Sequence, residues 1–183
     1  MTTRSLGAGF TLIEMLVVLA LVSILMSLAA PSLAAMVNSM RLTVAVNSLF
    51  SSLMLARSEA VKRNARVVVC KSVGGEACVT TGGWEQGWIV FHDANNNGLR
   101  DAGEVLLLQQ QALPAGVRLS GNSPLANYVS YTATGTTSYV SGAFQAGTLT
   151  ACKESSTQGD ARQIVISSAG RPRTVKTSAE RCP

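Results

Sequence analysis

The chain has 183 residues, which leaves room for one folded domain beyond a hydrophobic N-terminal segment and excludes a second one. Only 14% of the residues are charged, and the net charge is +5 at pH 7. A basic excess of this size permits binding to nucleic acid or to anionic lipid, but it does not demand either.

A hydrophobic stretch from Phe10 to Ala30 contains one ionisable side chain, Glu14. About 20 apolar residues suffice for a helix to span a bilayer. A carboxylate within such a span costs at least about 2.5 kcal/mol on insertion scales, so we expect Glu14 to have a function. The stretch therefore predicts one membrane-spanning helix with a functional carboxylate near its start.

The residues in front of this stretch differ from a secretory signal peptide. In such a signal small residues follow the apolar core, whereas here the small residues Gly7–Gly9 precede it. Cleavage after Gly9 would remove a polar leader and leave the hydrophobic helix on the mature chain. Arg4 would leave with the leader, so the net charge would fall from +5 to +4.

The order of Gly9, then Phe10-Thr11-Leu12-Ile13-Glu14, then an apolar helix resembles the type IV prepilin signature. The resemblance implies that a prepilin peptidase cuts between Gly9 and Phe10 and methylates the new Phe10 amine. It also implies that Glu14 faces the N-terminal amine of a neighbouring subunit, which is the partner that a buried carboxylate needs. The alternative is a plain signal anchor in which the glutamate has no role.

The helical pattern continues beyond the hydrophobic stretch. We expect Pro31 to kink the helix rather than end it, because the pattern resumes at once. Apolar residues at spacings of three and four form one stripe, namely Val46, Leu49, Leu53, Ala56 and Ala60. They predict one helix from Phe10 to about Arg63, roughly 80 Å long at 1.5 Å per residue. The expected segments are a leader (1–9), a transmembrane half-helix (10–30), an amphipathic half-helix (31–64) and a β-rich head (65–183).

In the head, short β-branched or aromatic runs alternate with turns rich in Gly, Asn, Ser and Pro. The expected strands are Val67–Val69, Trp88–Phe91, Val105–Leu108, Val117–Leu119, Tyr128–Tyr131 and Ile164–Ile166. The Ser/Thr/Gly-rich stretch from Thr132 to Gly147 predicts loops or an edge hairpin. These patterns predict an α+β fold in which a long N-terminal helix packs on an antiparallel β-sheet head.

The four cysteines all lie beyond the membrane segment, which suggests two disulfides in an exported domain. Sequence alone leaves three pairings open. We favour Cys70–Cys78, which closes a short loop containing two glycines, and Cys152–Cys182, which would tie the C-terminus to the domain. A zinc site is the alternative, but no pair has the close spacing of a metal knuckle.

Several blocks of the head are similar to the GspH/FimT/FimU family of minor pilins and pseudopilins. The blocks are Ala56–Asn64, Cys70, Gly83–Phe91 and Asp93–Gly98. The resemblance implies the type IV pilin fold, anchored in the inner membrane before assembly and displayed in a pilus, periplasmic to extracellular, afterwards. It implies other pilins as partners and no cofactor. Trp84 and Trp88 are expected to pack the sheet against the helix.

The most basic stretch of the head, Ser168–Lys176, follows the last expected strand. Gly170 permits a turn with positive φ, and Arg171 and Arg173 would point to one face of an extended chain. Pro172 donates no hydrogen bond and suits an exposed edge. Paired guanidiniums can each engage a phosphate through several donors. The basic patch formed by these two arginines would be widened by Lys176, Arg162 and Arg181.

This stretch matches the Gly-Arg-x-Arg motif of the FimT branch, which resembles a DNA-capturing pilin of natural transformation. The resemblance implies double-stranded DNA as a partner, bound without sequence preference through Arg171 and Arg173. The alternative is a solvated hairpin whose arginines only aid solubility.

A second motif, residues 93–104, places oxygen side chains as in a calcium-binding loop. The candidate ligands are Asp93, Asn95, Asn97, Asp101 and Glu104. Strands rather than helices are expected on both sides, and Arg100 adds a positive charge. A hairpin loop with Asn-Gly turn chemistry explains the same residues, so no metal is expected.

The case for an enzyme is poor. His92 is the one histidine, and no serine or threonine lies in a recognisable nucleophile elbow. The chain also has no phosphate-cradling Gly-Lys-Ser/Thr motif. We therefore expect a minor pilin of FimT type that is not an enzyme. The rival hypotheses are a FimU-like structural minor pilin and a GspH-like pseudopilin of type II secretion; the Arg171/Arg173 pair separates them from the DNA-binding hypothesis.

Overall fold

The computed structural model describes residues 10–154, 159–179 and 182. Gly9 and Arg181, which the sequence analysis singled out, lie outside these residues. The chain divides into two compact units, one ending at Asn38 and the other beginning at Ser39. One helix, α1, runs from Leu12 to Arg63 and so contributes to both units.

The first unit consists of the apolar part of α1. The side chains of residues 10–37 are exposed within it, and the helix is long and apolar enough to cross a membrane by length and composition. The helix begins after Thr11, whose hydroxyl accepts the Glu14 amide N–H at 3.3 Å, so it starts two residues later than predicted. It continues through Pro31, as the sequence pattern predicted.

The hydroxyls in this apolar unit are satisfied within the helix. Ser23 donates to the carbonyl oxygen of Ala20 at 2.8 Å, and Ser27 donates to that of Ile24 at 2.7 Å. Because a bilayer offers no water to such groups, this internal bonding is what a membrane helix requires.

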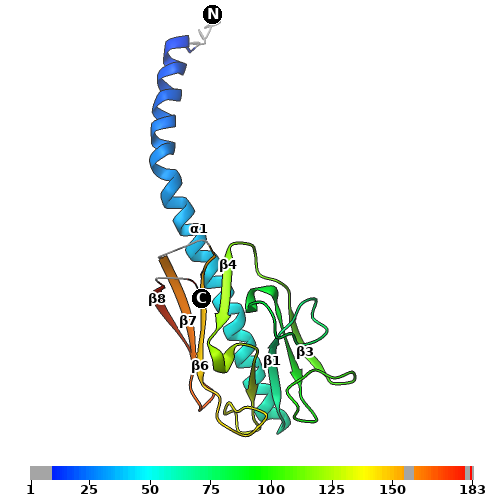
Figure 1. The fold of residues 1–183 in the computed structure, drawn as a ribbon. Coiled ribbons are helices and arrows are strands. Elements are labelled where there is room, and N and C mark those ends of the chain that lie inside the picture. Colours follow the sequence, from blue (N-terminus) through cyan, green and yellow to red (C-terminus); the bar gives the residue numbers. More distant parts are fainter. Residues whose placement is uncertain (1–9, 155–158, 180–181, 183) are drawn as a thin grey trace, which may run out of the picture. The chain divides into compact units, whose positions relative to one another are not determined.

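The second unit contains eight strands in two antiparallel sheets within its described residues (Figure 1). The first sheet has the order β3-β2-β1-β5, formed by β3 (Leu106–Gln110), β2 (Trp88–His92), β1 (Val67–Lys71) and β5 (Tyr128–Tyr131). The second has the order β4-β6-β7-β8, formed by β4 (Val117–Gly121), β6 (Gly147–Lys153), β7 (Gly159–Ile166) and β8 (Pro172–Ala179). Two short 3₁₀ helices, η1 (Trp84–Gln86) and η2 (Ser123–Leu125), lie between strands.

One hydrophobic cluster joins the second half of α1 to both sheets. The helix contributes its predicted stripe, Val46, Leu49, Leu53, Ala56 and Ala60, all buried. The sheets contribute residues such as Val90 of β2 and Ile164 of β7. The structure thus has the predicted α+β architecture, with the helix stripe setting the position of both sheets.

Two buried tryptophans fix the helix and the loops to this core. The Trp88 indole N–H donates to the Ser52 hydroxyl of α1 at 2.9 Å, and that of Trp84 donates to the Leu125 carbonyl at 3.0 Å. Both rings are fully buried and both polar atoms are satisfied, as a buried indole requires. Their role in the structure is the packing role expected from the sequence.

The strand prediction was incomplete in the second sheet. All six expected strands are present, but β6 and β8 were not predicted. In β6 the residues that alternate inward are Leu149 and Ala151, and Thr150 separates them. β8 forms an edge of its sheet, and its described side chains are exposed or half-buried. A strand without a buried face lacks the alternation on which such a prediction depends.

Two disulfides join the cysteines of the second unit, Cys70–Cys78 and Cys152–Cys182. These are the pairings that the spacing favoured. The first closes the loop after β1, and the second joins β6 to the end of the chain. With all four cysteines paired, the described residues leave no free thiol for a zinc site.

Candidate nucleic-acid interface

The turn between β7 and β8 positions the Gly-Arg-x-Arg motif. The Gly170 amide N–H donates to the Ser167 carbonyl at 2.8 Å, and Gly170 has a φ of +73°. A Cβ atom added at Gly170 would lie 2.1 Å from the carbonyl oxygen of Gly135. The turn therefore needs glycine for two reasons, its left-handed backbone and the close approach of a second loop.

Beyond this turn, Arg171 and Arg173 are both exposed and line one groove. The groove has a volume of about 600 Å³, and Pro172 lies between the two arginines at the start of the edge strand β8. Within the described part of the chain, no acidic side chain forms an ion pair with Arg171 or Arg173. Two uncompensated guanidiniums on one groove are suited to bind an anion.

The helix supplies a third arginine to the same groove. Arg57 lines it together with Phe50 and Met54, and its Nε donates to the Gly135 carbonyl at 2.9 Å. Sequence reasoning missed Arg57 as a site residue. Its position next to Ala56 in the buried stripe places it at the edge of the packed helix face, but that spacing does not show which strand faces it.

The residues predicted to widen the basic patch lie differently. In the β7–β8 pairing, Arg173 is opposite Val165, and Lys176 is opposite Arg162. Because side chains alternate along a strand, Arg173 and Lys176, three residues apart, emerge on opposite faces. Arg162 is half-buried, and its Nη2 donates to the Ser39 hydroxyl at 3.1 Å. Arg171 and Arg173 thus lie on one face of this strand pair, whereas Lys176 and Arg162 lie on the other face, where Arg162 contacts α1.

The charge of Arg57 acts on the phenol of a buried tyrosine, Tyr131. Burial raises the pKa of the Tyr131 phenol, and the Arg57 charge opposes part of this shift. The Tyr131 hydroxyl is buried without a hydrogen-bond partner among the described residues. It stays neutral at physiological pH, so it leaves the positive charge of the groove unchanged.

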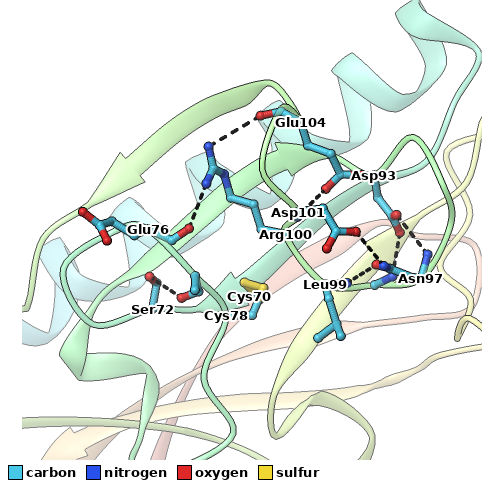
Figure 2. The surroundings of a disulfide bond; sticks show 12 residues. Cys70, Ser72, Glu76, Cys78, Asp93, Asn97, Leu99, Arg100, Asp101 and Glu104 are labelled. Carbon is cyan, nitrogen blue, oxygen red and sulfur yellow. Dashed lines mark hydrogen bonds between the residues drawn. A yellow bond between two sulfur atoms is a disulfide. The ribbon is translucent and has the colours of Figure 1, made fainter.

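The calcium-like loop between β2 and β3 is held by hydrogen bonds to its own backbone (Figure 2). Buried Asp93 accepts the amide N–H groups of Asn97 at 3.0 Å and Gly98 at 2.9 Å. Asp101 accepts the side-chain amides of Asn95 and Asn97, both at 2.7 Å. These candidate calcium ligands thus already accept hydrogen bonds from within the loop.

Glu104 completes this arrangement. Its two carboxylate oxygens accept the amide N–H groups of Ala94 at 2.8 Å and Asp101 at 3.1 Å. Within residues 10–154, 159–179 and 182, no three His, Cys, Asp or Glu side chains are grouped to hold a metal ion. The hairpin alternative accounts for these contacts.

Desolvation raises the pKa of Asp93, and the amides of Gly98 and Asn97 offset part of that rise.

Figure 2 also shows how this loop is tied to the disulfide-closed loop after β1. The Arg100 guanidinium donates to the backbone carbonyls of Glu76 at 2.9 Å and Glu104 at 3.5 Å. The Cys70–Cys78 bond lies beneath this contact. Arg100 therefore has a structural role here, joining two loops rather than offering a charge to a ligand.

The remaining candidates lie apart from the groove. Glu14 and Phe10 belong to the first unit, where their side chains are exposed. His92 is half-buried at the end of β2, where its amide N–H donates to the Val105 carbonyl at 3.0 Å. The position of His92 fits the strand-end role expected of it.

Comparisons with known proteins agree with this architecture. A family model described as "Type II transport protein GspH" matches residues 45–170, and one described as "Prokaryotic N-terminal methylation motif" matches residues 4–30. The pilin-like protein PilA1 of Thermus thermophilus is 38% identical over 96 residues, which are 52% of this chain and 54% of that protein. The chain therefore spans about half the length of this curated relative.

Solved structures share the fold. The type IV minor pilin FimU of Pseudomonas aeruginosa is 23% identical with a TM-score of 0.53, over 72% of this chain and 86% of that one. The minor pseudopilin EpsH from the type 2 secretion system of Vibrio cholerae is 13% identical with a TM-score of 0.52, over 74% and 96% of the two chains. At these identities the likeness shows the fold alone.

Proposed function

This chain belongs to the GspH family and is a minor pilin or pseudopilin of a type IV pilus or a type II secretion system, and we propose that it binds double-stranded DNA without sequence preference. The binding residues are Arg171 and Arg173 of the Gly-Arg-x-Arg motif, which Gly170 positions. The family is structural rather than enzymatic, so the proposal concerns binding and assembly, not catalysis.

The proposal depends on one observation: the β7–β8 turn presents two exposed, unpaired arginines that line one groove. Each guanidinium offers several donors in a planar fork that matches the geometry of a phosphate. Contacts to phosphates fix the position of a duplex but read no sequence. A site built from Arg171 and Arg173 therefore binds any duplex, with affinity that falls as salt rises.

Lys176 and Arg162 have a secondary part in this proposal. Neither residue lines the groove, so they add to the positive field around the edge rather than to the groove itself. A single head with two arginines binds weakly, in the non-specific range of roughly 10⁻⁴–10⁻⁶ M. Several copies in one filament would raise the overall affinity through avidity.

In the cell, the proposal assigns the chain to the FimT branch, with DNA capture for natural transformation as its role. A prepilin peptidase cuts after Gly9 and methylates Phe10, and Glu14 then pairs with the N-terminal amine of a neighbouring pilin. Residues 10–30 hold the precursor in the inner membrane, with 31–64 and the head, 65–183, outside it. The methylation-motif match over residues 4–30 supports this processing scheme.

The direct test is equilibrium binding of the full-length chain, in a non-ionic detergent, to a fluorescein-labelled 20-base-pair duplex. We expect wild type to bind and the double variant Arg171→Ala/Arg173→Ala to bind far more weakly while its thermal unfolding is unchanged. Arg118→Ala is the matched control, because Arg118 is an exposed arginine on β4, at the opposite edge of the same sheet. Equal binding by the double variant and the wild type would refute the proposal.

The structural alternative is a FimU-like or GspH-like subunit that serves only filament assembly. The observation in its favour is an exposed apolar flank of α1, where Met54 is 42% and Val61 is 54% exposed. This hypothesis predicts that the full-length chain does not bind the duplex at low salt. It also predicts that Arg171→Ala/Arg173→Ala leaves piliation and secretion unchanged.

A further inference from the structure

The groove beside the Gly-Arg-x-Arg motif has two walls, and only one of them carries the motif. The helix wall consists of Phe50, Met54 and Arg57 of α1. We propose that Arg57 is a third phosphate ligand, and that the whole groove is a subsite for one phosphodiester segment of a DNA strand. This inference rests on the proposed function, because it specifies how the same site holds its DNA.

Arg57 is already oriented for such a contact. Its Nε donates to the Gly135 carbonyl at 2.9 Å, which fixes the plane of the guanidinium. In the part of the chain that the structure describes, neither Nη1 nor Nη2 has a hydrogen-bond or ion-pair partner. One edge of the guanidinium is therefore anchored, and its terminal nitrogens remain available to a phosphate.

The Gly135 carbonyl also lies against the opposite wall of the groove, the turn that carries the motif. The Gly170 Cα lies so close to the Gly135 oxygen that an added Cβ would be 2.1 Å from it. The loop from Thr132 to Thr137 also donates to the turn, through the Thr137 amide N–H to the Ser168 carbonyl at 3.2 Å. Gly135 thus sets the spacing between Arg57 and the motif before any ligand arrives. A site fixed in this way avoids part of the ordering cost of binding.

The rest of the lining indicates the class of ligand. The groove is lined by the three arginines together with apolar residues, namely Phe50, Met54, Val165 and Pro172. A free phosphate offers nothing to apolar side chains, whereas a phosphodiester carries a deoxyribose on each side. The combination of forked donors and apolar surface therefore fits a sugar–phosphate backbone better than an isolated anion.

The number of phosphate contacts is measurable, because each contact contributes about 0.9 to the slope of log affinity against log salt. Three arginines predict a slope of about −2.7 for wild type, which is roughly a 40-fold loss of affinity between 50 and 200 mM salt. Without Arg57 the slope becomes about −1.8, or roughly a 12-fold loss over the same range. Without the motif arginines it becomes about −0.9.

The test is a salt titration of the full-length chain, in non-ionic detergent, against the labelled duplex. Arg57→Gln should reduce the slope by about 0.9 and weaken binding at 50 mM salt. Arg118→Gln, which removes a charge from the opposite edge of the sheet, should change neither. Met54→Glu, at an exposed position that lines the groove, should also weaken binding by placing a carboxylate there.

The outcomes separate the two proposals. If wild type does not bind the duplex, the proposed function itself fails. If wild type binds, and Arg171→Ala/Arg173→Ala strongly weakens binding, but Arg57→Gln and Met54→Glu both behave like wild type, only the present inference is overturned. Because Met54→Glu leaves the Arg57 anchor intact, it keeps the test decisive even where Arg57→Gln unfolds the protein. Competition by free inorganic phosphate as strong as that by the unlabelled duplex would also overturn the phosphodiester assignment.

Discussion

The contact between Gly170 and Gly135 can be tested by adding one methyl group. Gly170→Ala places a Cβ in the left-handed region, at a φ of +73°, which costs roughly 1–2 kcal/mol. The Cβ would also meet the Gly135 carbonyl oxygen at 2.1 Å, so the backbone of one loop must move. Overpacking of this kind costs typically about 1–3 kcal/mol. We therefore expect a total loss of roughly 2–5 kcal/mol in the free energy of unfolding.

Gly116→Ala is the matched control for backbone strain. Gly116 has a similar φ of +90°, but an added Cβ there would meet nothing within 4 Å. Its expected cost is the conformational part alone, roughly 1–2 kcal/mol. The difference between the two variants thus isolates the contact between the β7–β8 turn and the Gly135 loop.

Thermal unfolding followed by tryptophan fluorescence measures this difference, because Trp84 and Trp88 are buried in the second unit. In a domain of about this size, 1 kcal/mol shifts Tm by roughly 2–4 °C, so Gly170→Ala should lower Tm by about 4–20 °C. The surviving folded protein should also bind DNA less well, since the walls of the groove have moved apart. A Tm no lower than that of Gly116→Ala would refute the close approach and the positioning argument built on it.

Three further predictions concern the fold around the site. Ser52→Ala leaves the buried Trp88 indole N–H without its acceptor and should lower the free energy of unfolding by about 1–3 kcal/mol, measured by denaturant titration. Replacing Cys70 and Cys78 by serine frees a loop with a sequence separation of 8 and should cost about 2–3 kcal/mol in the same assay. Burial raises the pKa of Asp93 above its usual 3.8, so its contribution to stability is full below that pH and is lost as pH rises through the folded-state pKa. The free energy of unfolding of wild type, measured relative to Asp93→Asn, should therefore fall as the pH rises above 3.8; a constant or rising difference would contradict the burial of this carboxylate.

The features that were predictable from sequence are those with a local signal. The helix stripe from Val46 to Ala60 repeats at three and four residues, and strands such as Trp88–Phe91 are dense in β-branched and aromatic residues. The second sheet was harder. β8 is an edge strand whose described side chains are exposed or half-buried, so its pairing with β7 supplies the information that its own sequence lacks.

The candidate site shows the same division. Gly170, Arg171 and Arg173 lie within four residues, and their turn chemistry is visible in the sequence. Gly135 and Arg57 belong to the site only because the chain brings a loop and a helix to the turn from 35 and more than 100 residues away. Contacts between residues so far apart in the sequence depend on the assembled fold, and no residue spacing predicts them.

DNA binding by the Gly-Arg-x-Arg motif is best tested by the slope of DNA affinity against salt. It should be determined for the full-length chain and for Arg171→Ala/Arg173→Ala, between 50 and 200 mM salt, with the same duplex. We expect a slope of about −2.7 for wild type and about −0.9 for the double variant. No binding by wild type at 50 mM salt, or the same slope for both proteins, would contradict it and favour a purely structural minor pilin or pseudopilin.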